Sequence, residues 1–158
     1  MKKKLSSFWI FNIAGLLIGY FAIFRQLRSA GADVFAGTEL PAGFPSAAGL
    51  TVIWAFLFLL WGIGSYFVYS VPLRPRRERN IFLNSLILVI GIFIWNFLVF
   101  SSLNFPGALA VAIAVLLLAV VVWFMYLVIH RYGGYLFIPM MIWMVFLLYL
   151  SIALVVKN

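Results

Sequence analysis

Aromatic side chains recur at helical spacing within long apolar stretches of this sequence. Trp54, Phe58, Trp61 and Ser65 follow one another at intervals of four, three and four residues, so a helix would carry them on one face. Aromatic rings can stack on a flat ligand. The pattern indicates either a packed helix face or one wall of a ligand pocket.

The stretch YLFIPMMIWMVFLLYL repeats this arrangement with a proline. Pro139, Trp143, Phe146 and Leu150 share one helix face, and Tyr149 lies next to Leu150 in the sequence. Proline leaves a carbonyl one turn earlier without its helical donor and can bend the helix, which membrane proteins tolerate only where neighbouring groups compensate. The stretch therefore predicts a shaped surface as well as an apolar one.

A third stretch places Trp95 next to Asn96. An amide is costly to bury in hydrocarbon unless it is hydrogen-bonded. Packing is the ordinary explanation for any one of these residues, but interfaces between membrane helices usually favour small side chains. Three stretches with wide rings would hold their helices apart, so the residues support a pocket for a planar apolar ligand about as well as they support packing.

The chain has few residues that could bind a metal or carry out acid–base or thiol catalysis. There is no cysteine, His130 is the single histidine, and the three acidic residues, Asp33, Glu39 and Glu78, lie outside the apolar stretches. We therefore expect no required cofactor, no metal site and no ordinary acid–base or thiol catalysis.

Composition predicts an all-α membrane protein. Hydrophobic residues make up 67% of the 158 residues and charged residues only 9%, far from the balance of a soluble domain. A membrane-spanning helix needs about 20 apolar residues. We expect one domain, 1–158, folded as a bundle of five transmembrane helices over 6–25, 47–70, 81–103, 107–129 and 134–156, with the first retained and not cleaved as a signal peptide.

The net charge of +8 does not indicate nucleic-acid binding, because the basic residues lie in short loops beside apolar spans. Their distribution sets the expected orientation. We predict a multi-pass protein of a prokaryotic plasma membrane with a cytoplasmic N-terminus. One side would carry Lys2, Lys3, Lys4, Arg74, Arg76, Arg77, Arg79 and Arg131, and the other Arg25, Arg28 and Lys157.

The connections between the spans are unequal. Segment 26–46 is long enough to be functional, and its apolar side chains favour a partly ordered lid over a floppy linker. Pro106 suits the first turn of a helix, and Gly133 is expected to end the helix before it. Gly64 and Gly91 are expected at close helix contacts.

The most specific residues resemble a known membrane family. TspO/MBR proteins, the tryptophan-rich sensory proteins, end in a pattern close to L-L-P-Y-x-x-W-x-x-F-A-x-Y-L-N, followed by a basic residue and a final asparagine. This chain has Pro139, Trp143, Phe146, Tyr149 and Asn158 in the corresponding order. The resemblance covers nearly the whole chain.

The match continues in the second and third spans, with departures. Trp54 and Gly62 fit W-x-x-x-Y-x-x-M-G, but Phe58 stands at the tyrosine position. The asparagine expected after Tyr149-Leu150 is Ser151, and the first loop has no tryptophan. The pocket would therefore be more apolar than is usual in the family, and sterol recognition through the motif proposed for animal members is not expected.

The resemblance implies a receptor or sensor that binds porphyrins, haem or its precursors, or related planar hydrophobic ligands between its helices. Alternatives are a transporter of tetrapyrroles or lipids, and a light-dependent porphyrin-degrading enzyme that would use Trp54 and Trp143. Membrane lipids, a sterol and a second copy of the chain are further expected partners, the homodimer through a weak GxxxG signal at Gly15 and Gly19. The expected ligand residues are Trp54, Phe58, Trp95, Asn96, Pro139, Trp143, Phe146 and Tyr149, with Arg25, Arg28 or Lys157 as partners for porphyrin carboxylates.

Overall fold

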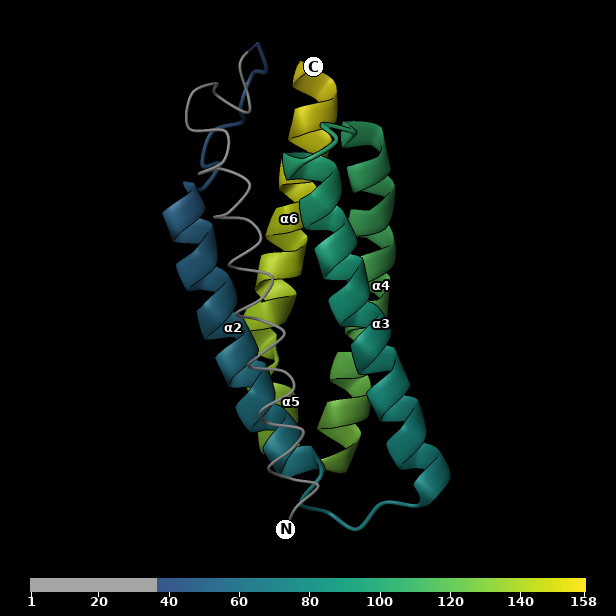
Figure 1. Cartoon of the computed structure of the whole chain (residues 1–158). Coiled ribbons are helices and arrows are strands. Elements are labelled where there is room, and N and C mark those ends of the chain that lie inside the picture. The colour runs from purple at the N-terminus through teal and green to yellow at the C-terminus, as the bar shows by residue number, and fades with distance from the viewer. Residues whose placement is uncertain (1–36) are drawn as a thin grey trace.

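The computed structural model describes residues 37–158, and this part of the chain is helical without strands (Figure 1). The predicted span 6–25, the glycine pair in it and residues 26–36 of the first loop lie outside the described residues. The helices are α2 (Ala47–Val68), α3 (Pro75–Phe100), α4 (Phe105–Ile129), α5 (Arg131–Leu136) and α6 (Ile138–Lys157).

Local sequence sets where the helices begin. Ser46 caps α2 by accepting a hydrogen bond from the Gly49 backbone N–H at 3.1 Å, and Asn104 caps α4 in the same way through Gly107 at 3.0 Å. Pro106 lies in the first turn of α4, as its position predicts. Because Pro75 also opens a helix, α3 begins there and not at residue 81, and it ends at Phe100 and not at residue 103.

The predicted final span, 134–156, is divided in two by the structure. α5 ends at Leu136 and α6 begins at Ile138, with Phe137 between them and proline in the first turn of α6. Pro139 has no N–H to continue the earlier helix. The bend expected from Pro139 therefore takes the form of a break at Phe137.

The prediction that Gly133 ends the preceding helix is wrong. α4 ends because His130 adopts an extended backbone, with φ −148° and ψ 113°, and Gly133 lies buried inside α5. A Cβ atom on Gly133 would lie 2.8 Å from a Val68 methyl group, and a Cβ atom on Gly64 would lie 3.0 Å from the Gly133 carbonyl oxygen. These two glycines let α2 and α5 touch, so the prediction of a close contact at Gly64 is confirmed.

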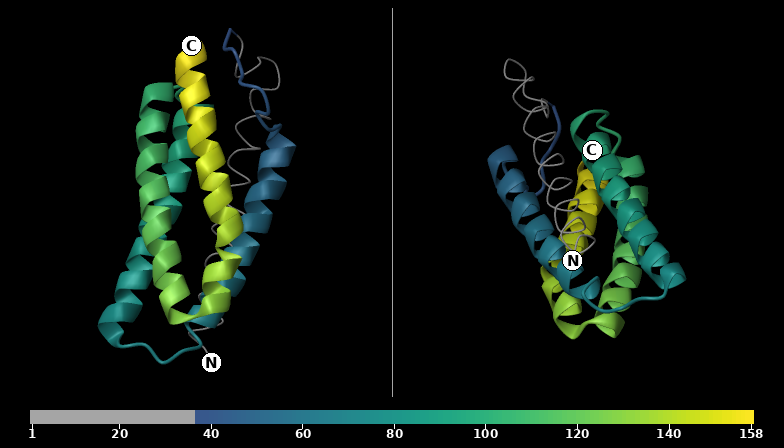
Figure 2. Two further views of the ribbon diagram at one scale, coloured as in Figure 1. Left: turned by 180° about the vertical axis from the view of Figure 1, so that it is seen from behind. Right: turned by 60° about the horizontal axis from the view of Figure 1, so that its bottom comes forward.

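The helices are arranged around α4, which packs against both α3 and α6. α2 packs mainly against α5, and its other end diverges from α6, as two opposite views show (Figures 1 and 2). The α2–α3 connection and the α4–α5 junction lie at one end of the bundle, and the α3–α4 connection and Asn158 lie at the other.

Length and hydropathy make this a membrane bundle. Within the described part, Pro75–Phe100, Phe105–Ile129 and Arg131–Lys157 (α5 and α6 together) are long and apolar enough to cross a membrane, and Val52–Val68 of α2 is a shorter apolar segment. Of an apolar stretch of 18 residues in each long span, only 28–33% is buried inside the protein. Apolar side chains on the outer faces, such as Leu117, Phe124 and Ile142, suit contact with lipid tails.

Candidate ligand-binding site

Aromatic rings of α2, of α6 and of Phe137, the residue before α6, form one continuous series, which we call the aromatic column. Successive ring centroids in it lie 5.2–6.0 Å apart, within the range of favourable aromatic pairs. In order of contact, the column consists of Tyr149, Phe146, Trp143, Trp54, Phe58, Trp61 and Phe137. Helix spacing places the members on facing surfaces, as the sequence predicts for each helix separately.

The contact that joins the two helices is between Trp54 and Trp143. Their ring centroids are 6.0 Å apart with an interplanar angle of 87°, an edge-to-face pair. Trp54 is fully buried and Trp143 is partly buried. Both indole nitrogens are shielded from solvent, and neither donates to any group in the part of the chain that the structure describes. Two neighbouring rings in the middle of the column therefore each carry a buried donor without an acceptor.

In the neighbouring Trp61, by contrast, the buried indole N–H has an acceptor. Its indole N–H donates to the Tyr126 hydroxyl at 3.1 Å. The Ser65 hydroxyl donates to the Trp61 carbonyl at 2.9 Å, which leaves its oxygen to accept from Tyr126, also at 2.9 Å. Trp61, Ser65 and Tyr126 are all fully buried, so this network satisfies its polar atoms inside the bundle and ties α2 to α4.

Trp95 and Asn96 on α3 have partners of their own. Trp95 donates to the Ser151 hydroxyl of α6 at 2.8 Å, and Ser151 donates to the Leu147 carbonyl. The Asn96 side chain donates to the Ile92 carbonyl at 2.9 Å, while its oxygen is buried without a partner in residues 37–158. Within residues 37–158, the ring of Trp95 pairs with Phe100 and with no member of the aromatic column, so its predicted place in the same site rests on the resemblance.

The described part of the first loop lies over one end of this arrangement. Phe44 packs against Phe100, with centroids 6.1 Å apart, and Gly43 lies close to the ring of Phe146. The Asn158 side chain accepts from the Glu39 backbone N–H at 2.9 Å and donates to the Glu39 carbonyl at 3.2 Å. The amide of Asn158 thus pairs with one peptide unit of the loop and fastens it to the end of α6.

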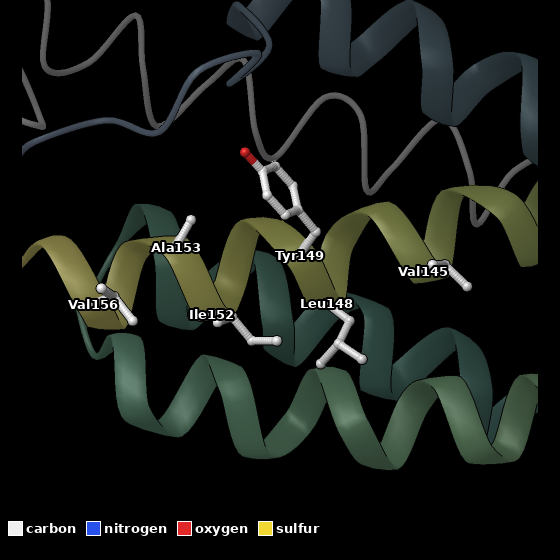
Figure 3. Close-up of a pocket in the computed structure, with 6 residues that line it drawn as sticks. All are labelled: Val145, Leu148, Tyr149, Ile152, Ala153 and Val156. Carbon is white, nitrogen blue, oxygen red and sulfur yellow. The ribbon is translucent and has the colours of Figure 1, made fainter.

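Two predicted ligand residues lie at the edges of the column. Pro139 occupies the first turn of α6, and Tyr149 is about half exposed. Tyr149 also borders an open apolar hollow of about 460 Å³ on the surface of α6 (Figure 3). The hollow is lined by Val145, Leu148, Tyr149, Ile152, Ala153 and Val156.

The structure therefore brings together Trp54, Phe58, Trp143, Phe146 and Tyr149. Sequence reasoning missed Phe137, which continues the column beyond Trp61, and Tyr126, which satisfies Trp61. The signal for Tyr126 was a hydroxyl in an otherwise aliphatic and aromatic span. Within residues 37–158, no group of three His, Asp or Glu side chains could hold a metal ion.

Comparison with models of known protein families shows to which family the chain belongs. The model of the TspO/MBR family matches residues 8–156, nearly the entire sequence. The chain belongs to this family. In a comparison with individually curated proteins, no sequence matched. The apolar helices and the aromatic column are thus features of a TspO/MBR membrane protein.

Proposed function

We propose that this TspO/MBR protein is a membrane receptor or sensor that binds porphyrins or related planar hydrophobic ligands at the aromatic column. The observation that carries the proposal is the Trp54–Trp143 pair, whose two buried indole N–H groups lack acceptors in the described chain. Buried donors are normally paired. A ligand that supplies acceptor atoms between flat apolar surfaces would satisfy both.

The chemistry of the column selects the class of ligand. Its rings offer apolar faces, while the predicted spans contain no Asp, Glu or Lys and only one Arg, Arg25, at the end of the first span. A planar macrocycle with acceptor nitrogens or oxygens fits this lining, and a small charged metabolite does not. Any porphyrin carboxylates would have to reach cations at the loop end, where Lys157 lies and where Arg25 and Arg28 are expected.

Two alternatives predict different outcomes for the bound ligand. A transporter would move it across the bilayer, but charged residues, which often mark such pathways, are missing from the interior of the predicted spans, where Arg25 at the end of the first is the one charge. A light-dependent enzyme would consume it, with Trp54 and Trp143 as the reacting side chains. A receptor binds the ligand saturably and leaves it in place and intact.

The test is a titration of the purified full chain, reconstituted in lipid nanodiscs, with protoporphyrin. We expect saturable quenching of tryptophan fluorescence, weakened about tenfold or more by Trp143→Ala and by Trp54→Phe, since a tenfold change corresponds to about 1.4 kcal/mol. Unchanged affinity in both variants would refute the site. Ligand flux in liposomes would favour the transporter, and bleaching in light that depends on both tryptophans would favour the enzyme.

Trp123→Phe is the matched control. The Trp123 indole nitrogen is also buried without a partner in the described chain, but Trp123 is on α4 and is not a member of the aromatic column. The substitution removes the same chemical group from a different place. We expect it to leave the affinity for protoporphyrin unchanged, whereas an effect as large as that of Trp54→Phe would mean that the column is not the binding site.

A further inference from the structure

Three rings of the aromatic column follow one another around α6. Trp143, Phe146 and Tyr149 are spaced by three residues, and each such step turns by about 60° around a helix of about 3.6 residues per turn. Successive ring centroids among them are 5.2 and 5.9 Å apart. The series therefore leads from Trp143, which packs on Trp54 of α2, to a ring about 120° farther around α6.

The exposure of these rings increases in the same order. Trp54 is fully buried, Trp143 and Phe146 are partly buried, and Tyr149 is 49% exposed. The described part of the first loop borders the series at Phe146, whose ring lies beside Gly43, and it leaves about half of Tyr149 uncovered. The column therefore becomes open to its surroundings at Tyr149.

The surroundings of Tyr149 are lipid and not water. Tyr149 precedes Lys157, the last residue of α6, by eight residues, which is about 12 Å of helix. The span Arg131–Lys157 has 27 residues and extends at most about 40 Å, whereas the hydrocarbon core of a bilayer is about 30 Å thick. A span centred in the bilayer therefore holds Tyr149 at the depth of the acyl chains.

The apolar hollow of about 460 Å³ on α6 adjoins this open end of the column. Tyr149 and Ala153 lie along one side of the hollow and Leu148 along the other (Figure 3). Its lining includes no charged side chain, and its size is within the roughly 300–1,000 Å³ of small-molecule sites. Because Tyr149 belongs to both the hollow and the column, an apolar molecule in the hollow borders the outermost ring of the column.

We propose that ligands reach the aromatic column from the bilayer, by docking in the hollow on α6 and then passing Tyr149 and Phe146 to Trp143. This proposal rests on the proposed function of the column and adds its route of entry. The occupant of the hollow is the same planar hydrophobic ligand, which partitions into lipid and meets an aromatic ring at the depth of its apolar part. The carboxylates of a porphyrin stay among the head groups, on the side of Lys157.

The experiment distinguishes the route from the binding site through rates. Nanodiscs that contain the full chain are mixed with protoporphyrin in a stopped-flow instrument, and tryptophan quenching gives the rate of entry. Dilution of loaded nanodiscs into excess empty liposomes gives the rate of exit. A group that blocks only the route raises the barrier and leaves the bound state unchanged. We therefore expect entry and exit to slow by the same factor, about tenfold, with the affinity within about twofold of the wild-type value.

The first block is a label in the hollow. The chain contains no cysteine, so a single introduced thiol can be modified selectively. Ile152→Cys, modified in detergent with a bulky apolar maleimide before reconstitution, fills the hollow. Ile113→Cys, modified in the same way, is the matched control, because Ile113 on α4 is 46% exposed, as is Ile152, but does not line the hollow. Both rates should fall in the labelled Ile152→Cys protein and in neither the labelled control nor the unlabelled variants.

Ala153→Phe is a second block, which needs no label. It places a ring in the hollow one helical turn from Tyr149, and Ala114→Phe makes the same change at an exposed position of α4. Unchanged rates in both hollow variants overturn the proposal, and so does equal slowing in the two controls. A loss of affinity with an unchanged exit rate also overturns it, because the hollow would then act on the bound state. Absence of saturable quenching in the wild-type protein would instead refute the proposed function of the column, so the two failures are distinguishable.

Discussion

The two halves of the aromatic column have the same kinds of side chain but differ in how their polar atoms are satisfied. Trp61 is held by Tyr126 and Ser65 through bonds of 2.9–3.1 Å. Trp54 and Trp143, which continue the same surface, have no acceptor in the described chain. We expect Trp61, whose N–H is bonded inside the bundle, to act in packing, whereas Trp54 and Trp143 are the pair for which we propose a ligand.

The largest effect should come from removing the ring of Trp61. Trp61→Ala leaves a cavity in a fully buried position and should lower the free energy of unfolding by about 3–5 kcal/mol. Unfolding in dodecylmaltoside micelles by increasing SDS measures the loss. Trp143→Ala, in the partly exposed position, should cost less stability but more ligand affinity. Equal losses of stability in Trp61→Ala and Trp143→Ala would contradict the proposed difference between a packing tryptophan and a ligand-binding one.

Removing the Tyr126 hydroxyl tests the hydrogen bonds that hold Trp61. Tyr126→Phe leaves the Trp61 N–H and the Ser85 and Ser65 hydroxyls without their shared partner. Hydrogen bonds between membrane helices contribute about 1–2 kcal/mol in model peptides, so we expect a loss of that size in the same assay. Affinity for protoporphyrin should stay near the wild-type value, because Tyr126 lies on the satisfied side of the column. A tenfold weaker affinity would contradict this.

Helical spacing was enough to predict which side chains share a face, but not which of them are bonded. Trp54, Phe58, Trp61 and Ser65 were expected together, and all four are buried. The partner of Trp61 comes from α4, 65 residues away in the sequence, and the spacing within α2 contains no information about that helix. For the same reason, helical spacing alone did not distinguish Trp54 from Trp61; only the resemblance to the family singled out Trp54.

The break at Phe137 was predictable only in part. Pro139 indicated a bend, but the position of the break depends on α5 packing against α2 through Gly64 and Gly133. That contact joins residues far apart in the chain. Local signals therefore predict that a helix is perturbed, and the tertiary contact decides where it ends.

Trp95, whose indole N–H donates to Ser151, is a second tryptophan with a bonded N–H and allows the same comparison. Ser151→Ala removes the acceptor of the Trp95 indole and leaves that N–H buried and unpaired. We expect a loss of about 1 kcal/mol in unfolding free energy. Ser102→Ala removes an exposed hydroxyl, just after the end of α3, that donates to the Leu98 carbonyl four residues earlier, and it should cost less than about 0.5 kcal/mol. If the two losses are alike, the Trp95–Ser151 bond does not stabilise the bundle.

The smallest effect is expected at the loop that covers the unbonded half of the column. Asn158→Ala removes both hydrogen bonds to the Glu39 peptide unit, and because they are exposed, the loss of stability should be only about 0.5–1.5 kcal/mol. Hydrogen exchange detects it locally: amides of residues 37–44 should exchange faster, while those of α4 should not change. If Phe44 and Gly43 shield Phe146 only while the loop is fastened, ligand should also enter and leave the column faster in this variant, with tryptophan quenching as the readout. Faster exchange with unchanged ligand kinetics would mean that the loop lies on the column without controlling access to it.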